Sequence, residues 1–207
     1  MPGSPDLSGD VLVTVWFDYT CPHCHVGLGR LDSLSGEVAF TIDRRPYLLR
    51  PHAPINSVLA QDRSVEAQSL THESPVRRPP LGEKPAAEPF SSRSLSTVLV
   101  HEATAFAREQ GRDREFYLET AGEYWERGSD LGSIYTLRRS ASRAGLDWES
   151  MWPKLESGHY RPWVLEEHRA AVEQGVKGVP SYEIGGKMYT GDVGIDALRA
   201  AVEGSPG

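Results

Sequence analysis

Residues 11–24 have the sequence VLVTVWFDYTCPHC, and this stretch decides the fold. The run from Val11 to Phe17 is short, almost wholly apolar and rich in β-branched residues, which is typical of a strand buried on both faces. Thr20 is a candidate N-cap and Pro22 suits a first helical turn, so we expect a helix from here to about Leu34. A strand that leads directly into a helix predicts an α/β sheet.

The rest of the chain continues this pattern after a long interruption. Residues 37–45 predict a second strand, residues 181–190 predict a hairpin with a Gly185-Gly186 turn, and residues 195–202 predict a final helix. In between, apolar residues recur at spacings of three and four, which predicts helices near residues 95–106, 116–125, 134–141, 148–155 and 162–172. The expected order is β-α-β, an all-helical insertion, a further helix, then β-β-α.

This order divides the 207 residues into two domains. We expect a discontinuous α/β domain over residues 1–52 and 162–207, and a helical insertion domain over residues 53–161. Within the insertion, residues 61–93 contain five prolines and few aliphatic residues. That composition predicts a long irregular loop.

Charge and hydropathy exclude two classes of partner. The chain has 22 basic and 29 acidic residues, a net charge of −7, which is unsuited to binding the phosphates of nucleic acids. No apolar stretch is long enough to span a membrane, so we expect no membrane contact. The N-terminal MPGSPD lacks the basic and apolar regions of a secretory signal, which predicts a cytoplasmic protein.

The two cysteines carry the candidate chemistry. A disulfide between Cys21 and Cys24 closes too short a loop to stabilise the fold much, which indicates a reactive rather than a structural pair. At the start of a helix, the helix dipole favours a Cys21 thiolate, the nucleophile of disulfide exchange. Cys24 lies within disulfide reach and can resolve a mixed disulfide formed at Cys21. His23 can add positive charge or a hydrogen bond to that thiolate.

Two other interpretations of residues 21–25, CPHCH, are weaker. The stretch matches the CxxCH pattern of c-type haem attachment, but that modification requires export and the N-terminus shows no export signal. Cys21, Cys24 and His25 could ligate zinc, but a structural site usually takes its other ligands from a second cluster, and none is evident. We therefore expect no metal site and no bound cofactor beyond the redox-active Cys21–Cys24 disulfide.

The chain resembles the DsbA-type thioredoxin-fold family, in its FrnE-like branch. The segments that carry the resemblance are WFDYTCPHC (16–24), RPYLLRP (45–51), AFAREQG (105–111), GLD (145–147) and GVKGVPSY (175–182). They occur in the family's order and cover nearly the whole chain. The resemblance implies a thioredoxin fold whose β-α-β and β-β-α halves flank an all-helical insertion domain.

The resemblance also implies roles for residues of the motif Cys21-Pro22-His23-Cys24 and of the distant Val179-Pro180. Cys21 corresponds to the attacking cysteine, Cys24 to the resolving one, and Pro180 to a cis-proline facing them. In such a geometry the backbone of Val179 binds an extended substrate peptide by strand addition.

Two residues depart from the family pattern. The FrnE-like branch usually has an aromatic residue at the position of His23. Thioredoxin and DsbA carry a buried acid, which assists proton transfer, at the position of Val15. These departures affect the redox poise and the proton relay rather than the reaction class.

The leading functional hypothesis is thiol–disulfide exchange on proteins or small thiols, as an isomerase or reductase in the cell. Its implied partners are protein or peptide disulfides and a thiol reductant, with glutathione as a candidate. The first alternative is a glutathione-dependent enzyme like the kappa-class transferases or 2-hydroxychromene-2-carboxylate isomerases, although these relatives usually have serine near the first-cysteine position. The second is a redox-regulated peptide-binding protein. The sequence makes no prediction of oligomeric state.

Overall fold

The structure is a computed structural model that describes residues 11–53 and 96–205. The loop predicted over residues 61–93 therefore lies outside the described residues. The chain divides after residues 49 and 166 into two compact units. We call them the sheet unit, with described residues 11–49 and 167–205, and the helical unit, with described residues 50–53 and 96–166. The domain boundaries expected after residues 52 and 161 stay a prediction.

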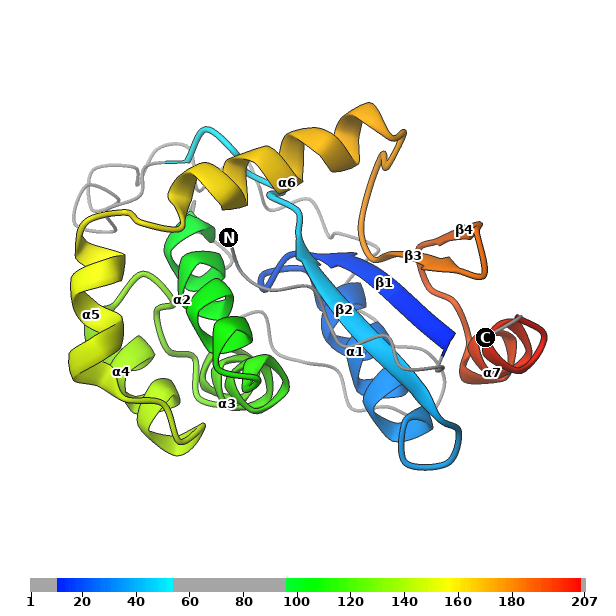
Figure 1. Ribbon diagram of the computed structural model, residues 1–207, viewed down its shortest axis with the longest axis horizontal. Coiled ribbons are helices and arrows are strands. Elements are labelled where there is room, and N and C mark those ends of the chain that lie inside the picture. The colour runs from blue at the N-terminus through cyan, green and yellow to red at the C-terminus, as the bar shows by residue number, and fades with distance from the viewer. Residues whose placement is uncertain (1–10, 54–95, 206–207) are drawn as a thin grey trace. The chain divides into compact units, whose positions relative to one another are not determined.

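The sheet unit holds a four-stranded sheet in the order β2-β1-β3-β4. Its strands are β1 (Val11–Phe17), β2 (Phe40–Pro46), β3 (Ser181–Ile184) and β4 (Lys187–Thr190). Strand β1 runs parallel to β2, beside it in Figure 1, and antiparallel to β3. Strand β2 begins three residues later than the expected residue 37, because the N–H groups of Glu37 and Val38 both donate to Leu34 O at the end of the preceding helix.

Helices cover both faces of this sheet. On one face, α1 (Pro22–Leu34) contacts α7 (Ile195–Glu203). On the other, Trp16 of β1 packs against Ala171 and Val176, in and just after the last turn of α6 (Arg161–Glu173). Buried on both faces, β1 occupies the middle of the core, as its apolar sequence predicted.

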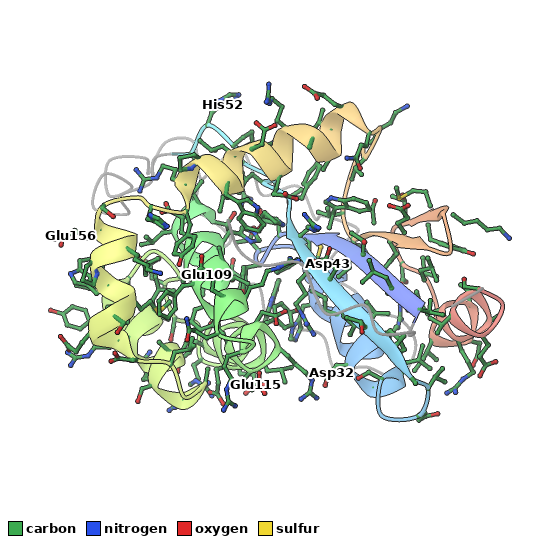
Figure 2. All side chains as sticks on the ribbon, viewed as in Figure 1. Asp32, Asp43, His52, Glu109, Glu115 and Glu156 are labelled. Atoms are coloured by element: carbon green, nitrogen blue, oxygen red, sulfur yellow. The ribbon has the colours of Figure 1, made fainter. Side chains whose placement is uncertain are left out.

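The helical unit is built from α2 (Val98–Glu109), α3 (Asp113–Trp125), α4 (Ile134–Arg143), α5 (Trp148–Glu156) and the beginning of α6. The carboxylate of Glu109, labelled on α2 in Figure 2, accepts hydrogen bonds from Lys154 Nζ at 3.1 Å and from Tyr160 Oη. These bonds join α2 to α5 and to the turn after it. The prediction of a thioredoxin-type α/β fold with a helical insertion is confirmed. None of the described helices has the length and apolarity needed to cross a bilayer.

A buried carboxylate ties three segments of the helical unit together. The side chain of Glu123 in α3 is 1% exposed. It accepts hydrogen bonds from Arg139 at 2.9 and 2.6 Å, from Arg143 at 2.9 Å and from Ser129 Oγ at 2.7 Å, and it pairs with Arg127 at 3.0 Å. These hydrogen bonds hold the pKa of Glu123 at about 2, with the bond from Arg139 as the largest cause. The carboxylate therefore stays charged at neutral pH.

Two glycines in α1 give a matched test of packing. A Cβ at Gly27 would lie 2.0 Å from Tyr182 Oη, whereas a Cβ at Gly29 would meet no atom within 4 Å. We expect Gly27→Ala to lower the free energy of unfolding by about 1–3 kcal/mol, because the buried ring must move. Gly29→Ala should raise it by up to about 1 kcal/mol, because alanine favours the helix. Urea titration of both variants measures these changes in the free energy of unfolding. A Gly27→Ala variant as stable as wild type would contradict the close packing of Tyr182 against Gly27.

Candidate active site

Asp18 fixes the turn between β1 and α1. Its buried carboxylate accepts hydrogen bonds from the N–H of Thr20 at 2.8 Å and from the Thr20 hydroxyl at 2.7 Å, both through Oδ1. Through Oδ2 it accepts a third from Leu49 N at 3.0 Å, which ties the segment after β2 to the same turn. The carbonyl of Asp18 accepts from Cys21 N at 3.1 Å. The start of the helix is thereby held in one position relative to the sheet.

The N-cap of α1 is Cys21 rather than Thr20, so that expectation was wrong. The Thr20 hydroxyl instead donates to Asp18 Oδ1 within the turn, and the helix begins one residue later. Cys21 has extended backbone angles (φ −90°, ψ 115°), and its Sγ accepts from Cys24 N at 3.4 Å. Pro22 follows at the first helical position, where its missing N–H costs no hydrogen bond. The reactive sulfur is therefore itself the helix cap.

The two thiols have opposite pKa shifts. The pKa of Cys21 is lowered, chiefly by a hydrogen bond from the Cys24 thiol and further by the N–H groups of Cys24 and His23, against the effects of burial and of the Asp18 charge. Burial raises the pKa of Cys24 well above its ordinary value, and its bond to Cys21 raises it further. The direction of both shifts agrees with the expectation of a Cys21 thiolate at the start of the helix. Both thiols are buried, with Cys21 5% exposed and Cys24 1% exposed.

The loop before β3 brings Val179 and Pro180 to the dithiol. The thiol of Cys21 donates a long hydrogen bond of 3.5 Å to Val179 O. The Val179–Pro180 peptide bond is cis, as predicted, and Gly191 N donates to Pro180 O at 2.8 Å. Val179 is half-buried and Pro180 is buried. Two segments far apart in sequence thus meet at the sulfur of Cys21.

The remaining predicted residues lie in the first turn of α1. Pro22 and His23 are both half-buried. His23 acts on the Cys21 thiolate through its backbone N–H. A contribution from its imidazole, the one the sequence suggested, stays a prediction.

Tyr182 is a site residue that the sequence did not single out. It lies directly opposite Val15 in the β1–β3 register, and both side chains are completely buried. Its Oη reaches the face of α1 at Gly27, one helical turn after Cys24. The one available signal was a glycine in the middle of an otherwise regular helix, which indicates that another group approaches closely.

The described part of the chain contains no preformed metal-binding site. Across residues 11–53 and 96–205, no group of three or more His, Cys, Asp or Glu side chains is placed to hold an ion. Both cysteines are free thiols in this structure. What the site offers is a nucleophilic sulfur, a second sulfur within its reach and a backbone carbonyl beside them.

Comparison with known proteins agrees with this geometry. The chain is 26% identical to the protein YwbO of Bacillus subtilis over 196 residues, which cover 93% of this chain and 96% of that one. A solved probable DsbA oxidoreductase from Streptomyces coelicolor superposes with a TM-score of 0.72 at 19% identity, over 94% of this chain and 89% of the other. A solved 2-hydroxychromene-2-carboxylate isomerase superposes with a TM-score of 0.63 at 17% identity, over 93% and 94%. At these identities the two structures show a shared fold.

The family itself follows from the sequence match. The model of the DSBA-like thioredoxin domain matches residues 12–203, which include the Cys21–Cys24 motif, the helical unit and the Val179-Pro180 loop. This chain belongs to the family of DSBA-like thioredoxin domains.

Proposed function

We propose that this protein is a thiol–disulfide oxidoreductase that works through Cys21 and Cys24, in the FrnE-like branch of its family. The observation that carries the proposal is the pair of opposite pKa shifts at the start of α1, lowered for Cys21 and raised for Cys24. The Cys21 thiolate is the nucleophile that begins disulfide exchange. Cys24 stays protonated during that first step and attacks in the second.

The reaction takes two steps. The Cys21 thiolate attacks one sulfur of a substrate disulfide, forming a mixed disulfide and releasing the other substrate sulfur as a thiolate. Cys24 then loses its proton and attacks Cys21 Sγ, which forms the Cys21–Cys24 disulfide and releases the second substrate sulfur. The two protons of the protein dithiol end on the two substrate thiols. A thiol reductant, with glutathione as the candidate, returns the protein to its dithiol form.

The backbone at Val179 supports a protein or peptide as substrate. Its carbonyl lies 3.5 Å from Cys21 Sγ, at the end of the loop that enters β3. An extended peptide that pairs with this backbone presents its own disulfide to Cys21. Pro22 follows Cys21 in the chain, and Pro180 follows Val179, whose carbonyl lies beside Cys21 Sγ, so we assign both prolines to shaping this approach.

The direction of electron flow follows from the stabilised thiolate. An interaction that stabilises the reduced form of a dithiol–disulfide couple makes that couple more oxidising. We therefore place the reduction potential of the Cys21–Cys24 couple between about −270 mV, as for thioredoxin, and about −120 mV, as for DsbA. The glutathione pool of a cytoplasm lies between about −320 and −220 mV, below most of this interval. In a cytoplasmic setting the dithiol is therefore reduced at rest, and the protein acts as an isomerase or reductase.

Insulin reduction by dithiothreitol tests the proposal. We expect the wild-type protein to accelerate the precipitation of insulin chains, and Cys21→Ser to remove the acceleration, because the remaining Cys24 is buried and its raised pKa keeps it protonated. A glutathione-dependent isomerase or transferase would instead retain its activity in the Cys21→Ser variant. A peptide-binding protein would bind insulin without accelerating its reduction. Either of those results would contradict the proposed function.

A further inference from the structure

The hydroxyl of Tyr182 is buried in the sheet unit without a hydrogen-bond partner. The side chain is completely buried, and Oη finds no partner among residues 11–53 and 96–205. Leaving a buried hydroxyl unpaired costs about 1–3 kcal/mol, and a phenylalanine ring would fill the same space without that cost. The hydroxyl therefore has no evident role in holding the resting fold together.

The position of this hydroxyl relates it to Cys24. A Cβ placed on Gly27 would lie 2.0 Å from Oη and 3.5 Å from Pro180 Cγ, so the tip of the Tyr182 ring and Pro180 both lie against α1 at this position. Cys24 precedes Gly27 by three residues, and positions three apart on a helix share a face with Cβ atoms about 5–6 Å apart. Cys24 and Gly27 are both buried. The Tyr182 hydroxyl and the Cys24 side chain therefore lie along one buried face of α1, one helical turn apart.

Electrostatic coupling supports the same placement. Burial is the largest cause that raises the pKa of Tyr182, and the charge of Cys24 is the next. A hydroxyl that stays protonated is a donor, and a donor near a sulfur stabilises the thiolate rather than the thiol. On β1, the side chain opposite Tyr182 is the apolar Val15, which can supply neither a proton nor a hydrogen bond.

The resolving step creates the need for such a donor. In the reduced protein the Cys24 thiol donates to Cys21. Once Cys21 is joined to a substrate sulfur, that acceptor loses its charge, and Cys24 must become a thiolate in a buried site that disfavours charge.

We propose that the Tyr182 hydroxyl donates a hydrogen bond to the Cys24 thiolate while Cys24 attacks the mixed disulfide at Cys21. The Cys24 proton passes to the departing substrate thiolate, the Cys24–Cys21 bond forms and the Cys21–substrate bond breaks. Tyr182 keeps its own proton throughout, so it acts through Cys24 as a positioning residue. The inference rests on the proposed function, because it assigns a group to the second step of that reaction.

The test resolves the two steps of one turnover. Reduced protein is mixed with dithiobis(nitrobenzoate), an aromatic disulfide that releases one yellow thiolate when Cys21 attacks and a second when Cys24 resolves. We expect Tyr182→Phe to leave the first phase unchanged within about twofold and to slow the second by about tenfold or more, as for loss of a hydrogen bond to a charged group. The pH at which the second phase reaches half its maximal rate should move upward.

Tyr189→Phe is the matched control, because Tyr189 is the cross-strand neighbour of Tyr182 on β4. It should leave both phases unchanged. A second phase that is as fast in Tyr182→Phe as in wild type overturns the inference, as does equal slowing of both phases, which would indicate a packing role. A wild-type protein that gives no first phase contradicts the proposed function itself, and the two failures are therefore distinguishable.

Discussion

In the reduced protein at about pH 6, we expect iodoacetamide to alkylate Cys21 and to leave Cys24 almost unmodified. Only the thiolate form of a cysteine reacts with iodoacetamide. At a pH below both pKa values, each unit of difference between the two pKa values changes the ratio of the two thiolate populations about tenfold. The hydrogen bond from Cys24 lowers the pKa of Cys21, whereas burial raises that of Cys24. Tandem mass spectrometry of the labelled peptide locates the modification. Equal labelling, or labelling of Cys24 first, would contradict the assignment of attacking and resolving cysteines.

The same argument predicts how Cys24 variants change Cys21. Because the Cys24 thiol is the largest cause of the lowered Cys21 pKa, Cys24→Ala should move the ultraviolet titration of the Cys21 thiolate to higher pH. Cys24→Ser keeps a donor at the same position and should retain most of the lowering. If both variants titrate like wild type, the backbone N–H groups at the start of α1 stabilise the thiolate without help from Cys24.

Local signals were sufficient to predict the chemical centre of the sheet unit. The apolar run of β1, the proline at the start of α1 and the Gly185-Gly186 turn each act on neighbouring residues, so their structures could be predicted from short stretches. The cap at Cys21 could not, because Thr20 is the better cap by residue type, and only the turn that Asp18 forms with Thr20 places the start of the helix one residue later. That choice also depends on Leu49, which lies 31 residues beyond Asp18.

Contacts between distant segments account for the other omissions. Nothing near Tyr182 in the sequence shows that its hydroxyl meets Gly27, because the contact exists only once β3 pairs with β1. Pro153 lies inside a continuous α5. The bonds from Arg139 and Arg143 to Glu123 join residues 16 and 20 positions apart, beyond the reach of helix-periodicity arguments.

Glu123→Gln should have the largest effect on the stability of the helical unit. Each pH unit by which folding lowers a pKa contributes about 1.4 kcal/mol, and the pKa of Glu123 is lowered to about 2. Since its three arginines are nearly half exposed and partly screened by water, we expect a loss of about 2–3 kcal/mol at neutral pH. Urea unfolding followed by tryptophan fluorescence measures this, because four of the five tryptophans lie in the helical unit.

The pH dependence of the free energy of unfolding distinguishes loss of the Glu123 charge from a packing defect in the Glu123→Gln variant. A carboxylate whose pKa is lower in the folded state stabilises the protein fully above its unfolded pKa of about 4.3, and this stabilisation is lost as the pH falls toward 2. The difference in free energy of unfolding between wild type and Glu123→Gln should therefore shrink steadily as the pH falls over that range. Glu126→Gln, which removes a carboxylate that is 71% exposed and 3.8 Å from Arg127, should change stability by less than about 0.5 kcal/mol. A Glu123→Gln deficit that persists unchanged at the acid end would show that the amide disrupts packing, and that the charge of Glu123 contributes little to the stability of the unit.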